Sequence, residues 1–154
     1  MTMRPTLSDQ AAEAQAHAVA GELAAELQRA GETADADLYD NSFATDVLWG
    51  TPFGATVIGY DRLNAIHHQL MDRQVAPPSR FEVVAAASPA PGVVVTQIRR
   101  QATDPGAFSE MAMYTLIERE GRWWLAAAQN TPIDPTKAAL TSGIVPAAAA
   151  QQNS

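Results

Sequence analysis

The adjacent histidines His67 and His68 are the side chains of this chain best suited to acid–base chemistry. Imidazole titrates near neutral pH, so a positioned histidine can accept a proton and return it. On a helix, His67 falls on the apolar side between Leu63 and Leu70, whereas His68 points roughly 100° away, toward solvent. Neighbouring helical residues diverge, and His17 is the only other histidine, so the pair is a poor metal site. His67 is then either a general acid/base that faces a ligand or a core histidine bonded to a backbone carbonyl.

A second set of candidate residues comes from the later half of the chain. Gln129 shares a predicted face with Met111 and Met113, and a buried amide needs a partner: a ligand oxygen, a strand neighbour or water. Gln97 would contact a ligand and Arg99 would anchor a carboxylate or enolate, or else both lie at a dimer face or the sheet rim. Trp49, Phe53, Met111 and Met113 are either core residues or the walls of a pocket for an apolar ligand. The predicted substrate-binding residues are therefore Trp49, Phe53, His67, Gln97, Met111, Met113 and Gln129.

The elements that position these residues centre on a predicted hairpin. Two apolar runs, Ser109–Glu118 and Arg122–Thr131, flank Arg119–Gly121, whose final glycine suits a three-residue loop. The resulting register pairs Ile117 with Trp123 and divides the side chains into two faces: Met111, Met113, Trp123 and Gln129 on one, and Tyr114, Leu116 and Trp124 on the other. Both faces are apolar, which predicts a sheet covered on both sides. We expect the chain's own helices over the first face, and a partner subunit or the chain's tail over the second.

Upstream patterns predict helices before the longer strands. The predicted elements are helices at 8–31, 35–43 and 62–73, short strands at 47–49 and 56–59, then strands at 81–87, 93–99, 109–118 and 122–131. The fold class is α+β, with three N-terminal helices packed on a curved antiparallel sheet. We expect a flexible leader at residues 1–8, a single domain at 9–132 and a mobile tail at 133–154.

Composition excludes several classes of function. The 154 residues carry a net charge of −7, which disfavours nucleic acid and anionic membranes as partners. There is no cysteine, so thiolate metal sites and cysteine nucleophiles are excluded, and the cytoplasm is the expected location. No apolar run reaches the ~20 residues of a membrane span. Glycine-rich phosphate loops and dinucleotide fingerprints are missing too, so we expect no cofactor.

Several short motifs resemble one family when taken in their order. They are Asp35-Ala36-Asp37, Phe43-Ala44 with Asp46, Pro52 with Gly54, Gly59 before a helix, Gly121-Arg122-Trp123, and the ending Ala127-Ala128-Gln129-Asn130-Thr131-Pro132. Together they resemble the SnoaL-like branch of the NTF2-like superfamily, over about Ala16 to Pro132. The ending is similar to the SgcJ/EcaC-type subgroup, several members of which belong to polyketide and enediyne antibiotic pathways. The resemblance implies a cone-shaped barrel, a homodimer formed through the convex sheet face, and a mostly apolar cavity under the helices.

The same resemblance shows what this chain lacks. Ketosteroid isomerase members place a general-base aspartate directly before the proline of the first strand, where this chain has Thr51. A neutral hydroxyl cannot remove a carbon-bound proton near neutral pH. Those enzymes also carry a tyrosine on the first helix, and the matching residues Ala24–Leu27 include no phenol. A steroid-isomerase mechanism is therefore not carried over.

Three functions remain open from the sequence, and with them whether the protein is an enzyme. One of the three is an unrelated stress or housekeeping function on the same fold; the other two are more specific. The first is a cofactor-free protein of natural-product biosynthesis. It would bind an apolar polyketide or polyene in the cavity and could isomerise or cyclise it, with His67 or Gln129 polarising the ligand. The second is a non-catalytic, dimeric accessory protein whose cavity is filled by side chains, which the missing base at Thr51 favours.

Overall fold

The computed structural model describes residues 2–137, in which the long helix α1 (Gln10–Thr33) comes first. Asp9 caps its start, because the Asp9 carboxylate accepts a 2.8 Å hydrogen bond from the backbone N–H of Ala12. The predicted stop at Gly31 is wrong: the helix continues to Thr33, and Ala34 takes the left-handed conformation with φ of 51°. Left-handed backbone at a helix end satisfies the last carbonyls, as the Ala34 N–H does here.

Two further helices follow. The single turn α2 (Ala36–Tyr39) is capped by Asp35, whose carboxylate accepts a 3.0 Å hydrogen bond from the N–H of Leu38. The helix predicted over 35–43 is too long, because Phe43 already begins a strand. Helix α3 (Tyr60–Asp72) buries Leu63 and His67, as its helical spacing predicts.

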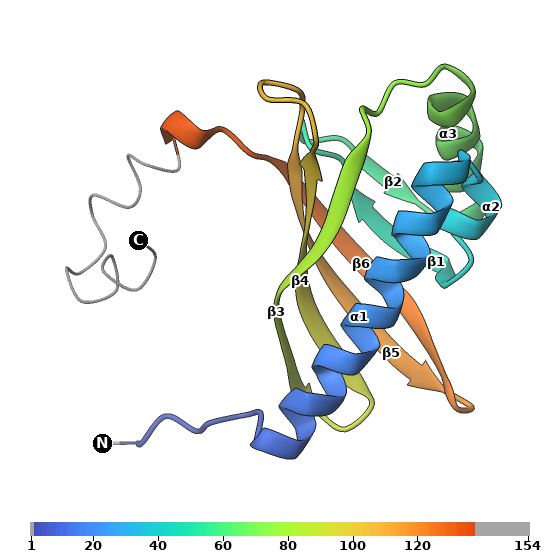
Figure 1. Ribbon diagram of the computed structural model, residues 1–154. Helices are drawn as coiled ribbons and strands as arrows, with labels where there is room; N and C mark the ends of the chain where they lie inside the picture. The colour runs from blue at the N-terminus through green and yellow to red at the C-terminus, as the bar shows by residue number, and fades with distance from the viewer. Residues whose placement is uncertain (1, 138–154) are drawn as a thin grey trace.

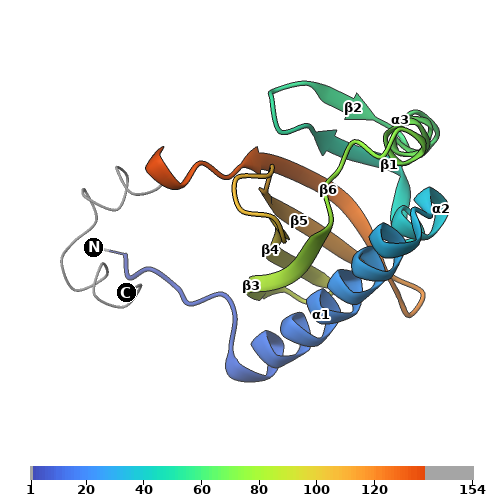
Figure 2. The same cartoon turned by 45° about the horizontal axis from the view of Figure 1, so that its top comes forward.

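Six strands form one sheet in the order β2-β1-β6-β5-β4-β3. Their bounds are β1 (Phe43–Gly50), β2 (Thr56–Ile58), β3 (Ser79–Ala90), β4 (Val93–Ala102), β5 (Glu110–Arg119) and β6 (Arg122–Pro132). Neighbouring strands pair antiparallel except β1 and β6, which are parallel. The predicted α+β class is confirmed, but the sheet is curved and open, with β2 and β3 at its edges (Figure 2). It does not close into a barrel.

The helices cover one face of this sheet, which we call the helix-covered face. Helix α1 lies diagonally across β3 and β4, while α2 and α3 lie together near β1 (Figure 1). Leu27 of α1, Val47 of β1 and Ile98 of β4 are sealed between the layers. Burial of side chains of this size stabilises the fold by ~1.5–3 kcal/mol each, so the contact between helices and sheet holds the molecule together. The opposite side of the sheet is called the open face below.

The hairpin between β5 and β6 has a different register from the predicted one. Arg119 pairs with Arg122, so the turn holds two residues, Glu120 and Gly121, with φ of 55° and 77°. Positive φ at both positions gives the right twist for a tight hairpin. The register then shifts between Thr115, which pairs with Ala127, and Leu116, which pairs with Leu125, so β6 has one extra residue there. The sequence pattern did not predict this irregularity.

The side chains of β5 lie on the opposite faces from those predicted, whereas Trp123 of β6 packs against the helix-covered core as predicted, because β6 carries an extra residue between the two parts of the hairpin. Tyr114 and Leu116 were expected on the outside, yet both are buried under the helices, while Met113 lies on the open face, 47% exposed. The physical reason is that both faces are apolar, so alternation groups the side chains without indicating which group lies inward. The neighbouring strand β4 shows which group faces inward, because its buried Val94 pairs with Leu116.

The ends of the predicted domain lie partly outside the described residues. The expected tail at 133–154 is described only to Lys137, and the Ile133 N–H donates a 2.9 Å hydrogen bond to the carbonyl of Ser109. In the expected leader at 1–8, the Ser8 hydroxyl accepts a 3.1 Å hydrogen bond from the N–H of Ser88. None of the helices described has both the length and the apolar character needed to cross a membrane.

Candidate functional site

The structure divides the predicted site residues into three places. His67 and Trp49 lie together under the helices, with ring centroids 5.3 Å apart. Phe53 lies in the turn after β1, 81% exposed, where its ring packs 5.7 Å from that of Phe108. The remaining four, Gln97, Met111, Met113 and Gln129, share the open face of β4, β5 and β6. The expectation that Met111, Met113 and Gln129 lie under the helices is therefore wrong.

A buried pair, Asp40 and His67, is the centre of the helix-covered site. Asp40 Oδ1 lies 2.6 Å from His67 Nδ1, and the two residues are 0% and 9% exposed. Asn64 of α3 donates a 3.1 Å hydrogen bond from Nδ2 to Asp40 Oδ2, so both carboxylate oxygens are engaged. The Asp40 carboxylate at this position accepts the hydrogen on Nδ1, which leaves Nε2 as the ring nitrogen that can contact a ligand.

Sequence reasoning did not identify Asp40. Asp40 follows the last residue of α2, while His67 is in the middle of α3, so the two meet only because α2 and α3 pack together. The available signal was the acidic run Asp35, Asp37 and Asp40, whose helical spacing points the three carboxylates in different directions, so that one of them can face the core. A fully buried carboxylate needs a partner, and the apolar-side histidine supplies it.

Aromatic rings surround the imidazole of His67. Tyr39, Trp49 and Phe43 lie with ring centroids 5.1, 5.3 and 6.2 Å from it, each nearly perpendicular to its plane. Edge-to-face packing of this kind fixes the ring plane and excludes water. His67 is thus held in one orientation by its carboxylate and by its aromatic neighbours.

Two phenols lie close to this pair: the ring of Tyr39 is 5.1 Å from that of His67, and the ring of Tyr114 is 6.2 Å from that of Trp49. Burial raises the pKa of Tyr39, and it also raises the pKa of Tyr114, with the nearby carboxylate of Glu110 adding to both shifts. Both phenols therefore stay neutral and can donate hydrogen bonds. Tyr114 has no hydrogen-bond partner among the described residues, although no described polar side-chain atom is both sealed from solvent and unpartnered. The Tyr114 hydroxyl consequently keeps contact with water-sized space.

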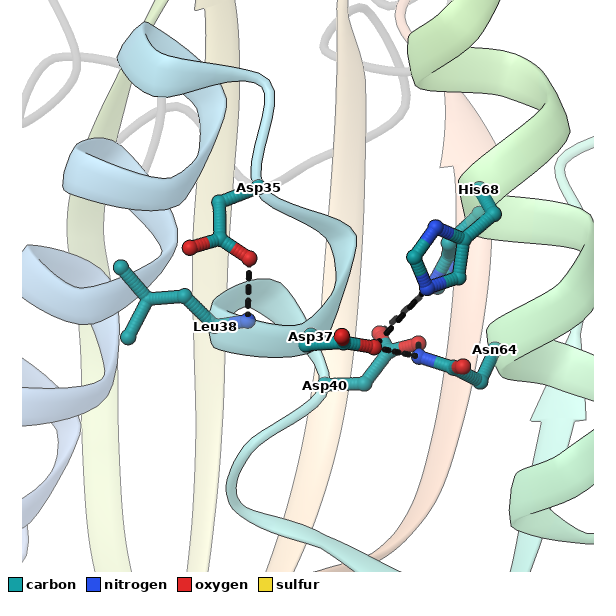
Figure 3. A network of polar contacts seen from close by, with 7 residues as sticks. Asp35, Asp37, Leu38, Asp40, Asn64 and His68 are labelled. Atoms are coloured by element: carbon teal, nitrogen blue, oxygen red, sulfur yellow. Dashed lines mark hydrogen bonds and ion pairs between the residues drawn. The ribbon is translucent and has the colours of Figure 1, made fainter.

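A second, exposed carboxylate–histidine pair flanks the buried one (Figure 3). His68 Nε2 lies 2.8 Å from Asp37 Oδ1, and Asn64 donates to the same oxygen at 3.2 Å. This contact raises the pKa of His68 and lowers the pKa of Asp37. Asn64 thereby links the two pairs, since its single amide contacts both Asp37 and Asp40.

The open face carries a shallow groove of about 340 Å³. Its lining residues are Leu48, Gly50, Thr56, Met113, Thr115, Ala127, Ala128 and Gln129. Gln129 lies across Gly50, where an added Cβ would meet the end of its side chain, so a larger residue at position 50 would require the Gln129 side chain to move. A second hollow of about 320 Å³ includes Leu23, Leu116 and Trp123. Neither hollow is lined by His67.

A comparison with solved structures finds the same arrangement of helices and strands in other proteins. An uncharacterized protein with a cystatin-like fold from Caulobacter vibrioides is 19% identical, with a TM-score of 0.64 over 82% of this chain and 95% of that chain. An NTF-2 like protein of unknown function from Shewanella oneidensis MR-1 is 11% identical, with a TM-score of 0.65 over 75% of this chain and 98% of that chain. The chain has an NTF2-like fold. A ketosteroid isomerase-like protein from Erwinia carotovora atroseptica shares the NTF2-like fold at 15% identity, with a TM-score of 0.62 over 77% of this chain and 96% of that chain.

Sequence comparisons add no narrower assignment to the NTF2-like fold. No model of a protein family matches the chain, and no curated protein sequence matches it. The expected SgcJ/EcaC-type subgroup and its antibiotic pathways therefore stay predictions, because one fold hosts many functions.

Proposed function

We propose that this protein binds a small apolar molecule beneath its helices and transfers a proton on it with His67, without a cofactor. The observation that carries the proposal is the buried Asp40–His67 pair, because a carboxylate on Nδ1 leaves Nε2 as an oriented base. The NTF2-like fold fits such a role as a small-molecule scaffold. The surrounding rings of Tyr39, Phe43 and Trp49 would favour an apolar ligand and keep water from the reacting atoms.

The reaction class that fits these groups is isomerisation through an enol or enolate. Nε2 of His67 takes a proton from the carbon beside a carbonyl; the electrons of the broken C–H bond form a carbon–carbon double bond, and the π electrons of the carbonyl group move onto its oxygen. Asp40 stabilises the imidazolium that results. The imidazolium then returns the same proton to another carbon of the ligand, so atoms and charge balance without a further reactant. A neutral phenol such as Tyr114 can donate a hydrogen bond to the charged oxygen meanwhile.

The proposed ligand is a polyketide- or polyene-like intermediate of natural-product biosynthesis. Support for this class comes from the resemblance of the chain's ending to the SgcJ/EcaC-type subgroup and from the apolar lining. Within the predicted set, His67 and Trp49 keep a role at this site. The four residues on the open face, Gln97, Met111, Met113 and Gln129, would bind a ligand only in the separate groove there.

Proton exchange on a simple ketone tests the proposal. In heavy water, the protein should speed the loss of the α-protons of an aromatic ketone such as a tetralone, followed by NMR. The substitution His67→Ala should lower that rate by roughly a hundredfold, the usual contribution of a general base. His17→Ala, an exposed histidine on α1, is the matched control and should leave the rate unchanged. Equal rates for the wild type and for His67→Ala would contradict the proposed catalysis.

A specific observation favours a second function, that of a non-catalytic dimeric accessory protein. Large apolar side chains remain exposed around the open face, among them Leu48, Ile58 and Met113, at 49%, 67% and 47%. Exposed apolar patches mark interaction surfaces. A homodimer formed through the open face would bury them. Absence of any proton exchange, together with a stable dimer, would favour this second function.

A further inference from the structure

We propose that Arg100 is the group that binds the carbonyl oxygen of the substrate, which makes the substrate class an apolar, enolisable ketone. This inference rests on the proposed function and extends it, because it assigns a second residue and a required functional group. The sequence pointed instead to Arg99, but Arg99 lies on the open face, with a half-exposed side chain whose Nη1 is 4.0 Å from Glu82. Arg100, the next residue of β4, points the opposite way and lies under the helices.

Only part of the Arg100 guanidinium is bonded to the protein, and these bonds hold the side chain in place. The residue is 7% exposed, its Nε donates a 3.0 Å hydrogen bond to Glu110, and its Nη1 donates a 3.0 Å bond to Ser79 Oγ. The ring of Phe108 lies 5.5 Å from the guanidinium carbon. These contacts fix the plane and direction of the guanidinium, as a preorganised binding group requires.

Arg100 still has donors to offer. A guanidinium carries five N–H groups, and Nη2 has no hydrogen-bond partner among the described residues. No described side-chain nitrogen is both sealed from solvent and unpartnered, so Nη2 keeps contact with water-sized space. The nearby hydroxyl of Tyr114 is in the same condition, buried within the fold yet unpartnered. Nη2 of Arg100 and the Tyr114 hydroxyl are therefore two hydrogen-bond donors that a single ligand oxygen could accept from.

The aromatic wall connects Arg100 to His67. Arg100 pairs with Phe81 across β3 and β4, and the ring of Phe81 lies 6.2 Å from that of Tyr39. The ring of Tyr39 lies 5.1 Å from that of His67. These contacts form a continuous aromatic wall between Arg100 and His67, and we place a flat ligand along this wall, with its carbonyl oxygen at Nη2 of Arg100.

The charge balance favours a neutral carbonyl over a carboxylate. Glu110 already neutralises Arg100, and a second carboxylate in a poorly hydrated site would be desolvated without a net positive charge to offset it. A carbonyl oxygen enters at little cost and gains negative charge only when His67 removes the proton. Arg100 then stabilises the charge at the moment it develops, which is where a fixed donor accelerates a reaction.

Naphthol and naphthalene provide the test, because naphthol adds one ionisable oxygen, a mimic of an enolate, to the same apolar body. Binding is measured by the NMR shifts of the His67 ring and by calorimetry. We expect naphthol to bind wild-type protein roughly tenfold more tightly than naphthalene, the usual effect of one charge-assisted hydrogen bond.

The substitution Arg100→Met should remove the difference in affinity between the two probes while keeping the binding of naphthalene. Arg99→Met, one residue away on the open face, is the matched control and should change neither. Because Arg100→Met leaves Glu110 unpaired, the double substitution Arg100→Met with Glu110→Leu gives a neutral, foldable version, and Arg100→Lys should restore part of the preference.

The outcomes separate the inference from the proposed function. If both probes perturb His67 with equal affinity, or if a folded Arg100 variant keeps the preference, Arg100 is not the oxygen-binding group and the proposed function stands. If neither probe perturbs His67, the apolar site itself is refuted. A preference for naphthol that depends on Arg100 and not on Arg99 supports the inference.

Discussion

At the scale of single residues, the proposed chemistry depends on the contacts of one buried carboxylate, that of Asp40. Asp40 is completely buried and contacts both His67 and Asn64, so it has no freedom to turn toward water. Such a carboxylate sets the tautomer of the histidine and stabilises its protonated form. The same contact that holds α2 against α3 would therefore give His67 its chemistry.

The substitution Asp40→Asn keeps the shape of this side chain and removes its charge. We expect the proton-exchange rate to fall by roughly a hundredfold, because the imidazolium loses its counter-ion and the preferred tautomer changes. The exchange rate on a tetralone and the NMR spectrum of the His67 ring report the two effects. Asp37→Asn, the exposed neighbour, serves as the control, and an equal loss in both variants would argue against a special role for Asp40.

The exposed pair of His68 and Asp37 gives a prediction about pH. The Asp37 carboxylate raises the pKa of His68 above its usual 6.5, and His68 lowers the pKa of Asp37 below its usual 3.8. The contribution of His68 to stability is complete below pH 6.5 and disappears as the pH rises through the raised pKa of His68. The contribution of Asp37 is complete above pH 3.8 and disappears as the pH falls through the lowered pKa of Asp37. NMR titration should show the pKa of His68 return toward 6.5 in Asp37→Asn. An unchanged midpoint would show that the pair does not form in solution.

At the scale of elements, the end of α1 contains a residue in an unfavourable conformation. Ala34 has φ of 51° and ψ of 44°, a left-handed conformation that costs an ordinary residue more than it costs glycine. The cap is useful nonetheless, because its N–H bonds to the carbonyls of Ala30 and Gly31 and turns the chain toward α2. The position of Asp40 depends on this turn, since α2 follows directly.

The substitution Ala34→Gly should raise the free energy of unfolding by about 0.5–1 kcal/mol, because glycine adopts the left-handed conformation without a steric penalty. Ala25→Gly, at an exposed position within α1, should lower the free energy of unfolding by about 1 kcal/mol. Denaturant unfolding measures both changes. Destabilisation by Ala34→Gly would mean that the helix does not end where the structure places its cap.

At the scale of the whole molecule, the helices protect only one face of the sheet. The open face presents Met113 beside the groove formed with Leu48 and Gln129. Water contact with such a surface is unfavourable, and a second copy of the chain is the proposed cover. The proposed proton chemistry and the proposed dimer therefore use opposite faces and can be tested separately.

The substitution Met113→Glu should convert the proposed dimer to a monomer, because like charges would meet at the symmetric contact. The melting temperature of the monomer should change little, since the Met113 side chain lies outside the core. Analytical ultracentrifugation gives the mass of each species. Met3→Glu, 88% exposed near the start of the chain, is the control and should remain dimeric. A monomeric wild type at every concentration would end the homodimer proposal.

The sequence by itself determined the class and order of the elements. Helical spacing identified α1 and α3, including the inward position of His67, and alternation with turn residues identified the long strands. These features are local, because a period of 3.6 or 2 residues depends only on which neighbours share a side. The motifs also indicated the NTF2-like fold, which solved structures share.

Only the tertiary structure decided which side chains meet. The partner of His67 is Asp40, 27 positions earlier, and no local pattern encodes the packing of α2 on α3 that joins them. The inward face of the hairpin was equally hidden, because Tyr114 and Met113 belong to two faces that are both apolar and differ only in what covers them. The tertiary structure also decided that Arg100, and not Arg99, points under the helices, since a shift of one residue along a strand moves a side chain from the interior to the open face.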